Sequence, residues 1–199
     1  MSVHLRQLRY SKRVRYYTVN YYCIAHKYLT LAQKFLIVAT GGTFDEIHVG
    51  HIALLTKAFQ VGKKVIIGVS SDKFATKRGK KLNHNFEARI ANLKKSIKKE
   101  FGNVNYEIAK LDGDFGPAVI TGNVQALVTS TETQRKGKAL NEMRTMRGLR
   151  PVKIVTVELV RAEDGSTVSS TRIRGGEIDR QGRLLNGIRD INEKIKNNK

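Results

Sequence analysis

Cysteine and long apolar runs are almost absent from the sequence. Cys23 is the only cysteine among 199 residues, so no disulfide can form within the chain. A single cysteine favours a reducing compartment, and we expect a cytoplasmic protein. No apolar run approaches the roughly eighteen residues of a membrane-spanning helix. The sequence therefore predicts a protein without a membrane span and long enough to bury a sizeable core.

Acidic residues are scarce as well. The chain has 17 Asp and Glu against 37 Lys and Arg, which gives a formal net charge of +20. Such a charge indicates a polyanionic partner. Nucleic acid is one candidate, and a nucleoside triphosphate with a phosphorylated co-substrate is another. A generally Lys-rich surface is the alternative explanation for most of the charge.

Residues 1–33 differ from the rest of the chain. The first acidic residue is Asp45, and six of the seven tyrosines lie in the first 34 residues. This basic, Tyr-rich composition is typical of a disordered extension, with an anion-binding arm or a targeting peptide as alternatives. We expect residues 34–199 to form one domain that does not need this extension.

A dense motif, Gly-Gly-Thr-Phe-Asp-Glu-Ile-His-Val-Gly-His, spans residues 41–51. It lies between an apolar stretch and a helical apolar pattern, so it is predicted to connect a buried strand to a helix. Such turns bind ligands in open α/β sheets. Gly42 would let a phosphate approach the backbone, and the helix N-terminus would attract it. His48 and His51, on either side of Gly50, would face the same ligand.

Strand and helix patterns alternate along the remaining chain. Apolar runs typical of buried strands occupy residues 35–40, 64–69, 104–111, 124–129 and 152–157. Amphipathic helical patterns separate most of these runs. The alternation predicts a single-domain, Rossmann-like α/β fold with a five-stranded parallel sheet and helices on both faces.

Helix ends and faces are predicted from local patterns. Gly62 is expected to end the first helix, and residues 130–133 are expected to cap a later one. Short helices are expected at 117–121 and 187–196. The predicted apolar side of the helix after residue 133 consists of Leu140, Met143 and Met146.

Cations follow two of the predicted strands. Lys77 and Lys80 belong to a cationic run, residues 73–81, that follows the second strand and falls at the same sheet edge as the 41–51 motif. Cations there would meet phosphates, with a solvated loop as the alternative. Arg135 follows the fourth strand and is placed to point into the same cleft. Later cations of that helix are expected to be solvated.

A hydroxyl-rich segment near the C-terminus could also bind phosphate. Ser169, Ser170 and Thr171 open a helical turn that continues to Arg174. Their N–H and O–H groups would form a nest for anionic oxygens, although an ordinary N-cap cluster is equally compatible. The aspartates at 112 and 114 are explained by turn chemistry rather than by a metal site.

These motifs together resemble those of archaeal-type phosphopantetheine adenylyltransferases, members of the HxGH nucleotidylyltransferase superfamily. The chain is similar, too, to the adenylyltransferase domain of eukaryotic coenzyme A synthase. The resemblance spans about residues 35–186. It includes the 41–51 motif, Phe-Glu-Ala-Arg, Ser-Thr-Glu-Thr, Leu-Val-Arg-Ala-Glu-Asp-Gly and Val-Ser-Ser-Thr-Arg-Ile-Arg. The first motif identifies only the superfamily, and the last two point to this member.

The resemblance implies transfer of AMP from ATP to 4′-phosphopantetheine, giving dephospho-coenzyme A and pyrophosphate. Mg²⁺ would be held mainly by ATP phosphates, with no dedicated protein ligands. His51 would stabilise the transition state and His48 would contact phosphates. The implied ATP-binding residues are Gly42, Gly50, Arg135, Ser169, Ser170, Thr171 and Arg174. Thr43, Lys77 and Lys80 would bind the acceptor phosphate.

Other functions remain as alternatives at this point. FAD synthetases, cytidylyltransferases and nicotinamide-nucleotide adenylyltransferases share the first motif. A basic nucleic-acid-binding protein is the non-enzyme alternative. We expect nucleic acid not to be the partner, because such a protein needs no pair of phosphate-binding turns at one sheet edge. The sequence specifies no oligomeric state.

Overall fold

The computed structural model describes residues 35–185, except 117, 118 and 121. The predicted extension at 1–33 and the predicted helix at 187–196 lie outside the described residues. The predicted helix at 117–121 lies partly outside them. In the part of the chain that is described, no helix is both long and apolar enough to cross a bilayer.

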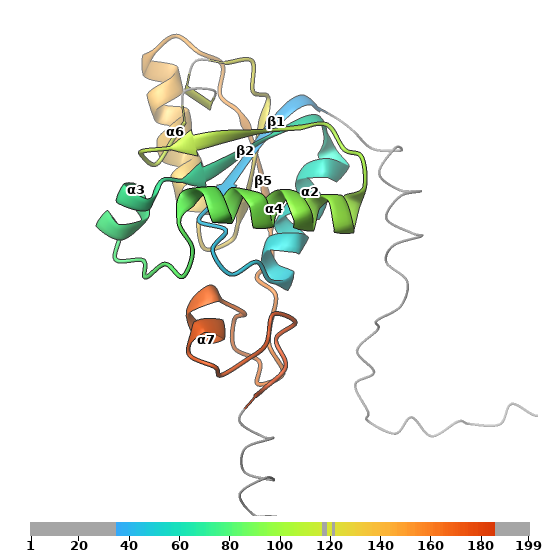
Figure 1. Ribbon diagram of the computed structural model, residues 1–199. Helices are drawn as coiled ribbons and strands as arrows, with labels where there is room; N and C mark the ends of the chain where they lie inside the picture. The colour runs from blue at the N-terminus through green and yellow to red at the C-terminus, as the bar shows by residue number, and fades with distance from the viewer. Residues whose placement is uncertain (1–34, 117–118, 121, 186–199) are drawn as a thin grey trace, which may run out of the picture.

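Five parallel strands form one sheet, as predicted (Figure 1). The strands are β1 (Phe35–Gly42), β2 (Gly62–Ser70), β3 (Tyr106–Leu111), β4 (Ala126–Ser130) and β5 (Lys153–Val157). Their order is β3-β2-β1-β4-β5. The chain moves outward from β1 to β3 and then returns to β4 on the other side of β1. This reversal opens a crevice at the carboxyl ends of β1 and β4, where ligands bind in such sheets.

Helices cover both faces of the sheet, which confirms the predicted layers (Figure 1). Side chains alternate along β1, so Val38 packs with α2 (Val49–Val61) and α4 (Phe86–Phe101). Its neighbour Ala39 lies in a second cluster on the opposite face, with residues of α6 (Gln134–Met146). The period of two along the strand thus supplies two hydrophobic cores.

The first helix ends where predicted, but the reason is packing. Gly62 caps α2 with φ −114° and begins β2 at once, with no loop between them. A Cβ atom at this position would lie 2.4 Å from Cγ2 of Val38. Glycine is therefore favoured here by the close approach of the Val38 side chain and not by a left-handed cap.

The predictions for α6 were confirmed only in part. Thr133 occupies the N-cap position, but its side chain makes no capping hydrogen bond. The apolar side is also rotated, because Met146 is 88% exposed while Arg144 is buried. Arg144 donates hydrogen bonds to the carbonyls of Val119 and Arg150, so this cation holds loops together and is not solvated.

Residues 158–185 form a small C-terminal lobe beside the carboxyl edge of the sheet (Figure 1). The lobe contains the short helix α7 (Ser170–Arg174) and has a small core of its own, made by Ala162, Val168 and Ile178. A further short helix, α3 (Asp72–Lys77), follows β2 and begins at the N-cap Ser71. These segments bring polar side chains to the edge where the crevice lies.

We predict that Gly62→Ala lowers the free energy of unfolding by about 1–3 kcal/mol, because its methyl group overpacks against Val38. Gly113→Ala is the control, since a Cβ atom there meets nothing within 4 Å. Urea unfolding of both variants measures the effect. Equal stability of the two variants would contradict the packing role of Gly62.

Candidate active site

A cavity of about 400 Å³ lies at the carboxyl edge of the sheet. Its wall comes from the ends of β1, β2, β4 and β5, from the start of α2 and from the C-terminal lobe. This volume falls within the usual range of small-molecule sites. The cavity therefore coincides with the crevice that the strand order creates.

The signature turn (residues 41–51) is shaped by Phe44, whose φ of 52° is left-handed. The Phe44 side chain is fully buried and packs on the His51 ring, with 5.0 Å between ring centroids. A Cβ atom on Gly42 would lie 3.2 Å from the Phe44 ring. The Phe44 side chain thus lies outside the cavity wall, while Gly42, which has no side chain, lines the cavity.

His48 is the N-cap of α2. Its Nδ1 atom accepts a hydrogen bond of 3.1 Å from the backbone N–H of Gly50. Burial lowers the pKa of His48 to about 4, so the ring is neutral at physiological pH. Because Nδ1 is an acceptor, the ring proton lies on Nε2, which is then a hydrogen-bond donor.

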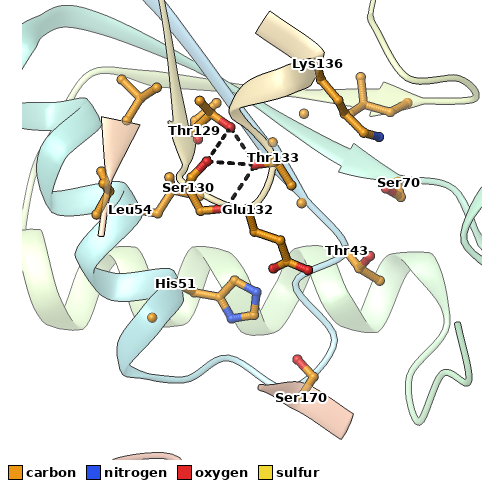
Figure 2. A pocket seen from close by; sticks show the side chains of 18 of the residues that line it. Thr43, His51, Leu54, Ser70, Thr129, Ser130, Glu132, Thr133, Lys136 and Ser170 are labelled. Atoms are coloured by element: carbon orange, nitrogen blue, oxygen red, sulfur yellow. Dashed lines mark hydrogen bonds between the residues drawn. The ribbon is translucent and has the colours of Figure 1, made fainter. Parts of the chain in front are cut away.

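His51 faces the centre of the cavity. Its ring centroid lies 4.0 Å from that of His48. Burial, and next the nearby His48, lower the pKa of His51 well below its usual range, although the backbone carbonyl of Glu46 acts in the opposite direction. Figure 2 shows the His51 ring directed at the same space as Thr43, Glu132 and Ser170. The two imidazoles lie side by side, as their spacing predicted, and burial makes both neutral.

Arg89 supports the signature turn from below. It is fully buried on α4 and donates hydrogen bonds to the carbonyls of Thr43 and, at 2.6 Å, Ser70. Asp72 balances its charge, with 2.8 Å between the carboxylate and the guanidinium. The sequence placed Arg89 in the Phe-Glu-Ala-Arg motif of an amphipathic helix and indicated no role for it.

The structure brings only part of the predicted cations into the cavity. Lys80 lines the cavity, whereas Lys77 lines a second hollow beside it. Arg135 is exposed and is not part of the cavity wall, so its predicted position was wrong. Its neighbour Lys136 lines the cavity instead and forms an ion pair with Asp114.

The hydroxyl-rich segment lines the cavity, but its hydroxyls also have structural partners. Ser169 caps α7 and accepts a hydrogen bond from the N–H of Arg172. Ser170 donates to the carbonyl of Glu46 at 3.2 Å. Arg174 donates to Thr171 at 3.3 Å and pairs with Asp45 at 3.1 Å. The cap is therefore confirmed, whereas the phosphate-binding nest stays a prediction.

A hydroxyl network fixes the turn between β4 and α6. Thr133 lies 2.5 Å from the hydroxyl of Thr129 and 3.0 Å from that of Ser130. The same turn directs the carboxylate of Glu132 into the cavity (Figure 2). Across the described residues, no group of three or more His, Cys, Asp or Glu side chains is arranged to hold a metal ion.

Comparison with known proteins identifies the family. The cytidylyltransferase-like family profile matches residues 39–176. The phosphopantetheine adenylyltransferase of Methanothermobacter thermautotrophicus is 40% identical over 159 residues, which are 80% of this chain and 95% of that protein. The enzyme of the same name from Methanosarcina barkeri is 42% identical over 161 residues, 79% of this chain and 98% of that protein. The chain belongs to the phosphopantetheine adenylyltransferase family.

A solved structure shares the fold. A protein of unknown function from Archaeoglobus fulgidus matches with a TM-score of 0.56 and 33% identity, covering 61% of this chain and 89% of that one. In this member of the phosphopantetheine adenylyltransferase family, the profile match includes both the signature turn and α7. The two histidines and Arg174 therefore lie in the part of the chain that the family shares.

We predict that His48 makes stability fall as the pH is lowered from 7 to 5. Its pKa is depressed from 6.5 to about 4 in the folded chain, so the unfolded chain gains protons that folded His48 does not. His48→Asn keeps a capping acceptor for Gly50 but removes this titration. The variant should lose about 1–2 kcal/mol less stability than the wild type between these pH values. Urea unfolding at pH 7, 6 and 5 measures the difference, and parallel curves would refute it.

Proposed function

We propose that this protein transfers the adenylyl group of ATP to 4′-phosphopantetheine, which gives dephospho-coenzyme A and pyrophosphate. The proposal rests on membership of the family and on one structural observation. Two neutral imidazoles at a helix N-terminus face the same cavity as the cations Lys80, Lys136 and Arg174. Such an arrangement suits two phosphorylated substrates that react with each other.

The chemistry requires no nucleophile from the protein. A phosphate oxygen of the acceptor attacks the α-phosphorus of ATP, the bond to the bridging oxygen breaks, and pyrophosphate leaves with that electron pair. The acceptor phosphate is already ionised, so no base needs to remove a proton. Catalysis then consists of positioning and of stabilising charge on the phosphoryl oxygens. Neutral His48 and His51 would do this as N–H donors.

We assign the two phosphate groups to different residues of the cavity lining. Thr43 and Lys80, from the ends of β1 and the loop after α3, would bind the acceptor phosphate. Arg174 and Lys136 would bind the outer phosphates of ATP, with Ser169, Ser170 and Thr171 beside them. The backbone of the signature turn at Gly42 and Gly50 would lie between the two. Lys136 here replaces Arg135, which is exposed outside the cavity wall.

Mg²⁺ would enter with ATP and neutralise charge on its phosphates. Two of the lining carboxylates, those of Asp45 and Asp114, are already paired with cations, which leaves Glu132 directed into the cavity. Phosphate oxygens and water would supply most of the ligands. The residues of this chain would bind and orient the phosphates rather than the ion.

Pyrophosphate release from ATP and Mg²⁺, with and without 4′-phosphopantetheine, tests the function. Release should require the acceptor, and His51→Ala should lower turnover about 10²–10³-fold, as expected for loss of one donor to developing charge. Pyrophosphate release from ATP that requires FMN or nicotinamide mononucleotide, and not 4′-phosphopantetheine, would assign a different acceptor. Release from CTP with alcohol phosphates would assign a cytidylyltransferase. Full turnover by a folded His51→Ala variant would remove His51 from the mechanism.

Adjacent residues of α6 offer a matched pair of variants. Lys136→Met should lower kcat/KM about tenfold or more, because it removes a cation that lines the cavity. Arg135→Met removes the same charge from an exposed position and should leave kcat/KM unchanged. Steady-state kinetics of both variants with ATP and 4′-phosphopantetheine test the assignment. The opposite ranking would restore the sequence-based prediction of Arg135.

A further inference from the structure

Asp45 is the most highly connected polar side chain around the cavity. Its carboxylate is 1% exposed. It accepts hydrogen bonds of 3.0 Å from the backbone N–H groups of Asn83 and His84, and it lies 3.0 Å from Nδ1 of His84. Nη1 of Arg174 donates to it at 3.1 Å. One buried carboxylate therefore joins three segments that are distant in the sequence.

The Asp45 carboxylate remains charged in spite of its burial. Burial acts to raise the pKa of Asp45, but the hydrogen bonds from Asn83 and His84 more than offset it and lower the pKa below the usual value. Its neighbour Glu46 accepts hydrogen bonds from the Asn83 side chain at 2.9 Å and from Arg180 at 2.8 Å. Both carboxylates belong to the signature turn, and these contacts hold them in place.

The C-terminal lobe depends on these carboxylates for its position. The small core of the lobe also contacts Val49 of the signature turn, and the other contacts between lobe and turn are hydrogen bonds and ion pairs. They comprise the ion pairs to Asp45 and Glu46, the Ser170 hydroxyl on the Glu46 carbonyl, and the N–H of Val49 on the carbonyl of Arg180. Electrostatic contacts therefore carry much of the alignment between α7 and the turn.

The guanidinium of Arg174 is suited to two tasks at once. Nη1 donates to Asp45 and Nη2 donates to Thr171 at 3.3 Å, while the residue also lines the cavity. A planar guanidinium has five N–H donors in a fixed fork, so a carboxylate on one side leaves donors for a phosphate on another. A carboxylate held rigidly behind the guanidinium would then fix the direction in which the remaining donors point.

We infer that Asp45 is a positioning residue that aims Arg174 at the outer phosphates of ATP. The inference rests on the proposed function only in taking ATP as a substrate. Asp45 also holds Asn83 and His84, which follow the loop that carries Lys80 and Lys81. The Asp45 carboxylate thereby links Arg174, assigned to ATP, to the loop of Lys80, assigned to the acceptor phosphate. Nothing in the 41–51 motif itself predicts this connection.

Isothermal titration of ATP and of AMP, both with Mg²⁺ and without acceptor, tests the role of Asp45. Asp45→Asn should weaken ATP binding about tenfold or more, because a misdirected guanidinium loses a charge-assisted hydrogen bond. AMP lacks the outer phosphates, so its affinity should change little. A general disturbance of the site would weaken both ligands equally and would overturn the inference.

Asp164→Asn is the matched control. Asp164 pairs with Arg172 of the same helix α7, and neither residue lines the cavity. Each variant therefore removes one carboxylate that faces an arginine of α7, but only Asp45 faces the one at the cavity. Asp164→Asn should retain wild-type affinity for both nucleotides. Equal weakening of ATP binding in the two variants would show that only the docking of the lobe matters.

A double-mutant cycle tests whether Asp45 acts through Arg174. In an Arg174→Met background, Asp45→Asn should cause little further loss of ATP affinity, since the group that it positions is already gone. Additive losses would overturn the inference. Arg174→Lys provides an arm that leaves the buried turn unchanged, in case Asp45→Asn does not fold. Lysine keeps the charge and has three N–H donors, but it lacks the rigid fork through which a carboxylate could fix the direction of the remaining donors. This variant should therefore bind ATP more weakly than the wild type, and wild-type affinity would refute the aiming role.

These outcomes separate the inference from the proposed function. No ATP binding by the wild-type protein would overturn the proposed function and the inference with it. Normal ATP binding without turnover on 4′-phosphopantetheine would reject the proposed acceptor, while the comparison of Asp45→Asn with Asp164→Asn would still decide the role of Asp45.

Discussion

The arrangement of the site depends on the buried guanidinium of Arg89. The carboxyl edge of a parallel sheet leaves backbone carbonyls without strand partners, and buried carbonyls must find donors. Arg89 supplies donors to Thr43 and Ser70 at the ends of neighbouring strands. It thereby fixes the signature turn relative to the loop that carries the cavity lysines. Asp72 offsets the free-energy cost of burying this cation. Its carboxylate also accepts a hydrogen bond from the N–H of Phe86, the first residue of α4.

The two imidazoles in the cavity are neutral, whereas the residues that line it around them include cations. Burial keeps His48 and His51 unprotonated, which makes them donors that do not form tight ion pairs with phosphate. The positive charge comes instead from side chains that acids hold in place, as Asp45 holds Arg174 and Asp114 holds Lys136. Cations fixed in this way need little reorganisation when a phosphate arrives, which is the condition for effective electrostatic stabilisation.

Sequence reasoning located the elements well and individual side chains on helices less well. All five strands were predicted, because their apolar runs are local and strongly periodic. On α6 the prediction selected Arg135 and Met146, whereas the structure places Lys136 in the cavity wall and buries Arg144. Consecutive residues on a helix point about 100° apart, so a small error in helix phase exchanges a buried position for an exposed one. The amino-acid composition of a helix does not show which way the helix is rotated about its axis.

The sequence by itself determined the five strands, the glycine-rich turn and the pairing of His48 with His51. Each of these features depends on residues that are close together along the chain. Only the tertiary structure decided which cations reach the cavity, which carboxylates pair with them, and that burial lowers the pKa of both imidazoles. Asp45 and Arg174 are 129 positions apart, and Arg89 is 46 positions from Thr43. Such contacts form only when the crossovers of the sheet bring distant segments to one edge, and no local pattern encodes them.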